Sequence, residues 1–123
     1  MNTVIIGIGS NIHPEENIIE ALKLLGESFK VLQVSTMVRT SPIGITDQPD
    51  FLNGAVKIIT ELDASSLQTI LKKIEDKLGR DRSLPKFGPR TMDLDVVVWN
   101  GEIVDQDYYS RPFLQRSVKE LTG

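Results

Sequence analysis

The feature that most constrains this fold is the order in which strand-like and helix-like hydrophobic patterns alternate along the chain. Short β-branched, apolar runs indicate strands. Apolar residues at three- and four-residue spacing indicate two amphipathic helices, one including Ile18 and Leu25 and the other Leu67 and Leu78. The predicted order is strand, helix, strand, strand, helix, strand, which is typical of a ferredoxin-like βαββαβ sandwich, an α+β fold. We expect an antiparallel sheet with the helices packed on one face and the other face open.

Turn and capping signals set the expected limits of these elements. Gly26 and Gly79 are placed to end the two helices, and Asp63 or Ser65 can cap the second. Asn100-Gly101 is the preferred two-residue hairpin turn. The expected strands cover residues 3–8, 29–40, 51–60, 92–99 and 102–104, and residues 112–121 are expected to form a short helix.

Length and composition bound the organisation of the chain. Its 123 residues suit a single domain over residues 1–123, and 25% charged residues are ordinary for a soluble globular protein. The sequence contains no cysteine, which excludes disulfides and thiolate metal sites. A net charge of −3 argues against nucleic acid as a partner, and no apolar stretch approaches the roughly 20 residues that span a bilayer. We therefore expect a cytoplasmic protein that binds neither nucleic acid nor membranes.

Asp93 and Asp95 are the sharpest functional signal. Residues two apart on a strand share a face, so both carboxylates are expected to lie side by side. Adjacent carboxylates repel one another, and a divalent cation such as magnesium, which prefers oxygen ligands, relieves that repulsion. The alternative is a solvated strand face without a ligand. The opposite, apolar face of the strand is expected to pack on the helices through Met92, Leu94, Val96 and Val98.

A basic segment directly precedes the two carboxylates. Residues 80–90 contain two prolines and a glycine, so we expect a loop, and its cations are Arg80, Arg82, Lys86 and Arg90. Cations beside a metal-binding acidic pair suit phosphoryl transfer, which depends on positioning and charge neutralisation. For any one arginine the alternative is a salt bridge to Asp81 or Glu75. The sequence has no G-x-x-x-x-G-K-[ST] motif, which excludes an ordinary P-loop.

Four segments together resemble one known family, in the same order along the chain. Residues 88–95 (GPRTMDLD) are similar to the signature of the 6-hydroxymethyl-7,8-dihydropterin pyrophosphokinase family. Residues 7–11 (GIGSN), 39–53 and 75–80 resemble its first strand end, its pterin-binding loop and strand, and the end of its second helix. The resemblance covers most of the chain, from Val4 to about Val104, and the combined spacing is highly specific.

The resemblance implies an activity and a set of roles. Members of that family transfer a diphosphate from ATP to a hydroxymethyl-dihydropterin in folate biosynthesis and release AMP. The resemblance implies two magnesium ions on Asp93 and Asp95, with ATP as co-substrate, and it makes Arg82 and Arg90 catalytic alongside those carboxylates. The implied ATP-binding residues are Glu75, Arg80, Arg82 and Arg90, and the implied pterin-binding residues are Thr40, Ser41, Ile43, Phe51, Asn53 and Phe87.

The C-terminal part departs from that family. Many members are longer there and carry a histidine after a proline, whereas here Phe113 follows Pro112. Arg111, Arg116 or Lys119 could supply nucleotide contacts instead. The short tail leaves more of the sheet uncovered, so we expect a monomer or a small homo-oligomer.

Two other functions stay open on the sequence alone. A relative that binds pterin but has lost or altered catalysis fits the departures in the tail. A ferredoxin-like RNA-binding domain fits the fold and predicts exposed aromatic residues on the central strands, for which Phe51 and Trp99 are the candidates.

Overall fold

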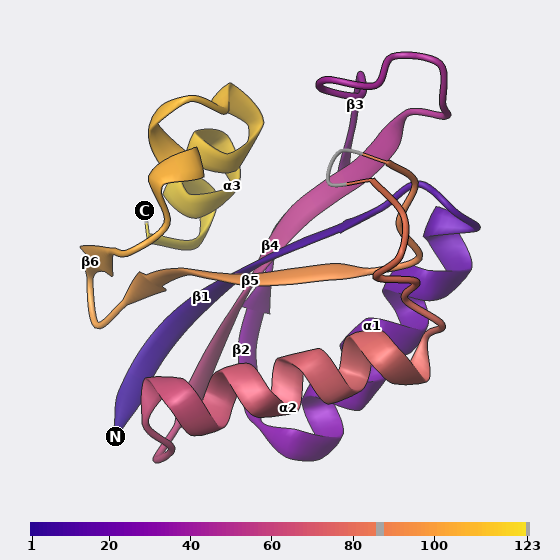
Figure 1. Cartoon of the computed structure of the whole chain (residues 1–123). Helices are drawn as coiled ribbons and strands as arrows, with labels where there is room; N and C mark the ends of the chain where they lie inside the picture. Colours follow the sequence, from indigo (N-terminus) through magenta and orange to yellow (C-terminus); the bar gives the residue numbers. More distant parts are fainter. Residues whose placement is uncertain (86–87, 123) are drawn as a thin grey trace.

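The computed structural model describes residues 1–85 and 88–122, and the expected elements appear in the expected order (Figure 1). The α+β class is confirmed. In the described part of the chain, no helix is long and apolar enough to cross a membrane. The elements are β1 (Asn2–Ser10), α1 (Pro14–Ser28), β2 (Lys30–Val34), β3 (Val38–Thr40), β4 (Phe51–Thr60), α2 (Ala64–Lys77), β5 (Asp93–Trp99), β6 (Glu102–Ile103), the short 3₁₀ helix η1 (Gln106–Tyr109) and α3 (Pro112–Thr122).

The strands form one antiparallel sheet in the order β2-β4-β1-β5-β6, and β3 also pairs with β4. β1 lies between β4 and β5 and pairs with both along most of its length. In this register Gly9 of β1 is opposite Asn53 of β4 on one side and opposite Asp93 of β5 on the other. Residues from three distant parts of the sequence are therefore brought together at one end of the sheet.

The helices α1 and α2 cover one face of the sheet, as predicted. Alternate residues of β1, including Val4 and Ile6, are fully buried against apolar side chains of the two helices, such as Leu25 and Leu67. Asp63 is the cap of α2, because its carboxylate accepts the backbone N–H of Ser66 at 2.8 Å.

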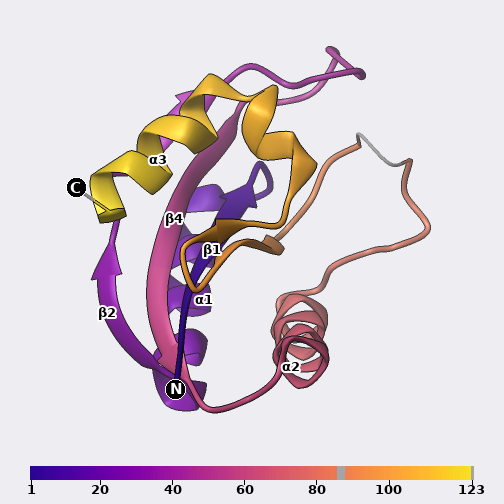
Figure 2. The same cartoon turned by 90° about the vertical axis from the view of Figure 1, so that its left-hand side faces the viewer.

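The third helix, α3, packs on the opposite face, so the expectation that the helices pack on one face holds only for α1 and α2 (Figure 2). Its apolar residues Leu114, Val118 and Leu121 recur at helical spacing and form a second core with Ile5 and with residues of β4 and β5. An amphipathic helix has to bury its apolar stripe, and this sheet face offers the apolar surface that it needs.

Three local expectations are wrong, and packing decides each case. The first helix continues through Gly26 to Ser28 and ends only where Phe29 enters the core. The expected strand over residues 29–40 breaks into β2 and β3, because Met37 folds onto β4 at Gly54, where any Cβ atom would overlap the methionine sulfur. A register shift between β1 and β5 turns Val98 toward α3 rather than toward α1 and α2.

Candidate active site

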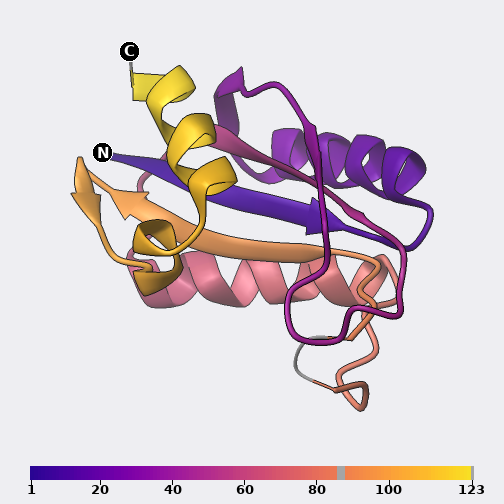
Figure 3. The same cartoon turned by 90° about the horizontal axis from the view of Figure 1, so that it is seen from above.

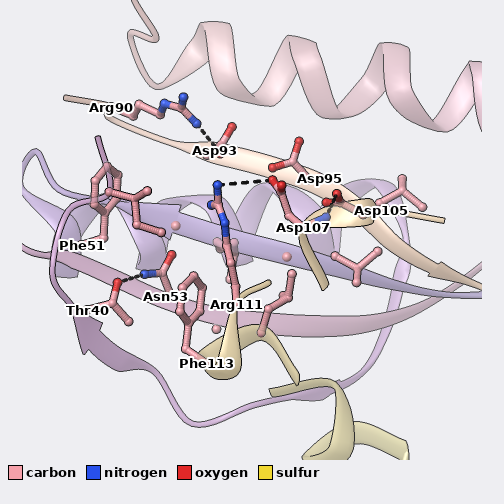
Figure 4. Close-up of a pocket in the computed structure, with 18 of the residues that line it drawn as sticks. Thr40, Phe51, Asn53, Arg90, Asp93, Asp95, Asp105, Asp107, Arg111 and Phe113 are labelled. Atoms are coloured by element: carbon pink, nitrogen blue, oxygen red, sulfur yellow. Dashed lines mark hydrogen bonds and ion pairs between the residues drawn. The ribbon is translucent and has the colours of Figure 1, made fainter. Parts of the chain in front are cut away.

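A cavity of about 520 Å³ opens between the ends of the central strands and the start of α3 (Figure 4). It lies on the sheet face that α3 covers in part, because Val97 and Leu114 belong both to its lining and to the second core. Many of the predicted site residues line it, from two parts of the sequence: Thr40, Ser41, Ile43, Phe51 and Asn53, then Arg90, Asp93 and Asp95.

One end of the cavity holds the residues predicted to bind pterin. Thr40 and Asn53 meet because β3 pairs with β4, and the Asn53 amide nitrogen donates to the Thr40 hydroxyl at 2.5 Å. Phe51 is half-buried at the start of β4, and Ile43 is exposed on the loop between the two strands. Phe87, the remaining predicted pterin contact, lies outside the described residues.

Gly9 makes room for the Asn53 side chain. A Cβ atom at position 9 would lie 2.5 Å from the Asn53 side-chain oxygen, which is closer than any real contact. The absence of a side chain in β1 thus allows the amide of the neighbouring strand to lie across it, at the boundary between the polar pocket and Asp93.

The other end of the cavity is acidic. Asp93 and Asp95 both line the cavity from β5, on one face of the strand as predicted. Two arginines hold Asp93: Arg80 donates to one carboxylate oxygen at 3.1 Å and Arg90 to the other at 2.7 Å. The Asp93 carboxylate is therefore held between two ion pairs within the protein.

The Asp95 carboxyl has a perturbed pKa. It meets solvent inside the cavity, but the surrounding protein desolvates it and the negative charge of Asp93 lies close by. These effects raise the pKa of Asp95 to about 8, with a smaller contribution from the charge of Asp105. A raised carboxyl pKa marks a place where a cation would be favoured.

Glu75, predicted to contact ATP, does not line the cavity but lies behind it. It is 4% exposed, and one carboxylate oxygen accepts the backbone N–H of Leu94 at 2.8 Å, between the two aspartates. The other oxygen accepts from Arg82 at 3.0 Å, and Arg80 lies 3.6 Å from the oxygen that accepts the Leu94 N–H. Glu75 thus connects α2, the strand that carries the carboxylates and two of the arginines.

Arg82 forms ion pairs with acidic residues of α2. One of them is Glu75, as the salt-bridge alternative raised by the sequence predicted. Asp76 also accepts from its guanidinium at 3.0 Å, and these bonds, chiefly that to Glu75, raise the pKa of Arg82. Asp81 is not a partner of this kind, because its carboxylate accepts from the hydroxyl and backbone N–H of Ser83, and these bonds lower the pKa of Asp81.

Asn11 connects the loops around the cavity through hydrogen bonds. It is 3% exposed, and its amide nitrogen donates to Gln48 at 2.9 Å and to the Pro49 carbonyl at 3.0 Å. Its amide oxygen accepts the backbone N–H of Arg90 at 2.8 Å. Viewed from above, the loop over residues 41–50 and the described part of the segment before β5 lie at the same end of the sheet (Figure 3).

Sequence reasoning missed several residues that line the cavity after β6. Asp105 caps η1, Gln106 and Asp107 belong to η1, and Phe113 comes from the first turn of α3. The usable signal was the Asn100-Gly101 hairpin, which adopts positive φ at both residues and turns the chain back toward β5. That signal predicted that the chain reverses direction after β5, but not that the segment after β6 would line the cavity.

Of the basic residues near the C-terminus that the sequence suggested as nucleotide contacts, one lines the cavity and two lie on the surface. Arg111 lines the cavity and points into it, and its guanidinium lies 3.5 Å from the Asp107 carboxylate (Figure 4). Arg116 and Lys119 are exposed on α3 and do not line the cavity. Of the three candidates raised by the sequence, only Arg111 is placed to meet a ligand there.

Comparisons with known proteins find relatives of this chain that are named pyrophosphokinases. A bacterial relative from Haemophilus influenzae, named 2-amino-4-hydroxy-6-hydroxymethyldihydropteridine pyrophosphokinase, is 36% identical over 124 residues, which cover 98% of this chain and 77% of the relative. A protein of the same name from Bacillus subtilis is 38% identical over 109 residues, covering 86% of this chain and 65% of that protein. The chain also matches 27% of the length of a folate synthesis bifunctional protein from Arabidopsis thaliana, at 34% identity.

The profile of one protein family covers the site and nearly all of the chain. Residues 5–123 match the 7,8-dihydro-6-hydroxymethylpterin-pyrophosphokinase (HPPK) profile, a range that includes the paired aspartates, the arginines around them and the polar pocket. The chain therefore belongs to the HPPK family.

Proposed function

We propose that this protein transfers a diphosphate from ATP to 6-hydroxymethyl-7,8-dihydropterin and releases AMP. One observation carries the proposal: a single cavity joins a polar and aromatic pocket to a pair of carboxylates surrounded by arginines. The names of the bacterial relatives, which are pyrophosphokinases of a hydroxymethyldihydropteridine, support the same substrate class.

The pocket end suits a flat, hydrogen-bonding ring. Asn53 can both donate to and accept from the edge of a pterin, and its existing bond to Thr40 orients the amide before a ligand arrives. Phe51 offers an aromatic face for stacking, and Ser41 and Ile43 complete that wall. Phe87 is proposed as a further contact from the segment before β5.

The acidic end fits magnesium. In the described residues no group of three or more histidine, cysteine, aspartate or glutamate side chains could hold a metal ion without further ligands. Asp93 and Asp95 thus provide two oxygen donors, and the rest would come from ATP and water, which is the way that magnesium commonly binds in phosphoryl-transfer sites. We propose two ions on this pair. When bound, magnesium neutralises charge on the β- and γ-phosphates.

The arginines act by exchanging partners. Arg80 and Arg90 now neutralise Asp93, and Arg82 is bound to Glu75 and Asp76. With ATP and magnesium bound, Asp93 would have cations in place of its guanidinium partners, and phosphate oxygens would accept hydrogen bonds from the arginines instead. The arginines would then hold the triphosphate.

The reaction needs in-line placement of two groups. The pterin pocket presents the hydroxymethyl oxygen toward the acidic end, where that oxygen attacks the β-phosphorus. The new O–P bond forms as the bond between the β-phosphorus and the oxygen of the α-phosphate breaks, and AMP leaves. Positioning and electrostatic stabilisation account for most of the rate in such transfers.

The test is product analysis with ATP, magnesium and hydroxymethyl-dihydropterin. We expect AMP and the pterin diphosphate in equal amounts, and ADP as the nucleotide product would refute the assignment. Pterin binding without any AMP would instead support a relative that has lost catalysis. Of the two aromatic candidates for the RNA-binding alternative, Trp99 packs against the core beneath α1 and α2, whereas Phe51 lines the cavity.

A further inference from the structure

Arg111 is a cation that lines the cavity. Neither packing in the described core nor stabilisation of α3 explains an arginine at this position. Its backbone carbonyl accepts the N–H groups of Leu114 and Gln115, so Arg111 stands at the N-terminal end of α3. A positive charge is unfavourable there, because the helix dipole is also positive at that end, and the first turn of α3 contains no acidic residue. Helix stability therefore does not explain an arginine at this position.

The only acid paired with Arg111 among the described residues is Asp107, and that pair is loose. The two side chains are 3.5 Å apart, and the Asp107 side chain is 55% exposed. Ion pairs of this kind contribute little to folding. The pair does keep the guanidinium inside the cavity, where the side chain itself is 28% exposed.

The charge pattern of the cavity identifies the kind of ligand. The described cations that line it are Arg90, which comes from the segment before β5, and Arg111, which comes from the opposite wall at α3. The pterin end is lined by the neutral side chains of Thr40, Ser41 and Asn53, as befits an uncharged ring. A guanidinium that points into a cavity shared with metal-binding carboxylates matches phosphate oxygens, which accept its planar fork.

We propose that Arg111 binds the phosphate chain of ATP from the side of α3, facing Arg90, which comes from the segment before β5. This inference rests on the proposed function. Asp107 holds the guanidinium in place before the nucleotide arrives, and the phosphate then replaces or joins Asp107 as its partner.

The experiment compares Arg111→Gln and Arg111→Lys with the wild type, and uses Arg116→Gln as the matched control on the same helix. Each protein is tested for AMP formation with ATP varied at saturating pterin, and then with pterin varied at saturating ATP. Binding of α,β-methylene-ATP with magnesium is measured separately, since this analogue lacks the bond that the transfer would break. Melting temperatures are recorded for all four proteins.

We expect Arg111→Gln to lower kcat/KM for ATP, and the affinity for the analogue, by about 10- to 100-fold, because a charge-assisted hydrogen bond is lost. Arg111→Lys should recover part of the loss, Arg116→Gln should match the wild type, and melting temperatures should agree. Unchanged analogue affinity in Arg111→Gln overturns the inference. A loss confined to pterin, or a lower melting temperature with normal activity of the folded protein, does so as well.

Failure of the proposed function gives a different result. If the wild type forms no AMP, the transferase assignment fails, and the binding of α,β-methylene-ATP still decides whether Arg111 contacts a nucleotide. If the wild type forms AMP and all variants do so equally, only the role of Arg111 fails.

Discussion

Asn11 and Arg90 are 79 residues apart in the sequence and hold each other through two hydrogen bonds. The backbone N–H of Asn11 donates to the Arg90 carbonyl at 3.0 Å, and the backbone N–H of Arg90 donates to the Asn11 side-chain oxygen at 2.8 Å. The same asparagine binds the loop that leads from the proposed pterin pocket into β4. One buried amide thus sets the distance between the proposed pterin pocket and an arginine of the acidic end.

We expect Asn11→Ala to lower both stability and turnover. The substitution leaves the Pro49 carbonyl and the Arg90 N–H without their buried partner, at a cost of roughly 1–3 kcal/mol in the free energy of unfolding. Asn2→Ala is the control, since it removes a bond to the Leu62 carbonyl far from the cavity. Chemical denaturation and steady-state kinetics test the pair. Equal effects on kcat/KM in both variants would contradict a positioning role for Asn11.

Gly9→Ala is expected to weaken pterin binding in a protein that still folds. The new methyl group would lie 2.5 Å from the Asn53 side-chain oxygen, so we expect it to displace the flexible end of Asn53 from Thr40. A tenfold or greater rise in the pterin dissociation constant would follow from the loss of an oriented amide, on the order of one to two hydrogen bonds. Fluorescence titration with a pterin measures it, and wild-type affinity would show that Asn53 is not a contact.

Gly26→Ala is the control for Gly9→Ala, since the same substitution is expected to stabilise the protein there. Gly26 lies in the last turn of α1, with no atom within 4 Å of an added Cβ. Replacing glycine by alanine in a helix stabilises it by roughly 0.5–1 kcal/mol. The midpoint of denaturation should rise and pterin affinity should not change. A lower midpoint would mean that Gly26 ends the helix in solution.

Asp95→Asn is expected to stabilise the metal-free protein and to abolish turnover. The folded-state pKa of Asp95 is raised above that of an unfolded aspartate, so the folded state binds the proton more tightly. Wild-type stability attributable to Asp95 is therefore lost as the pH rises from about 4 to about 8. The melting-temperature difference between variant and wild type should grow over this range and level off above it. A difference that does not change with pH would contradict the raised pKa.

Magnesium provides the complementary measurement on the same pair of proteins. Only the wild type keeps both carboxylates, so added magnesium and ATP should raise its melting temperature and leave Asp95→Asn nearly unaffected. Equal stabilisation of the two proteins would place the metal elsewhere.

Arg82→Ala separates a catalytic arginine from a structural one. Glu75 keeps its bond to the Leu94 N–H in this variant, but its other buried carboxylate oxygen loses the Arg82 donor, so the melting temperature should fall and turnover is compared per folded protein. The exposed pair with Asp76 contributes only about 0–1 kcal/mol. Turnover should fall by about 10²-fold or more if Arg82 moves to the phosphates. Arg39→Ala, which removes an exposed pair with Glu15, is the control. An unstable Arg82→Ala protein with normal specific activity would make Arg82 structural.

Local patterns were enough to predict most elements and part of the site. Period two on β5 placed Asp93 and Asp95 on one face, and the residues at 40–53 were expected to be near them only through the family resemblance. On β5 the patterns missed the exception at Val98, because a shifted register depends on the partner strand and not on the strand's own sequence.

The sequence by itself determined which chemical groups are available, namely two carboxylates, a set of arginines and a polar pocket. They lie on or beside helices and strands that the periodicity of apolar residues predicted. Only the tertiary structure decided which of these groups meet. It placed Glu75 behind the cavity rather than in it, because a buried carboxylate satisfies the Leu94 N–H there, and it brought Arg111 into the cavity by packing α3 on the second face. Contacts between distant segments depend on how whole surfaces pack together, and the periodicity of a single segment does not contain that information.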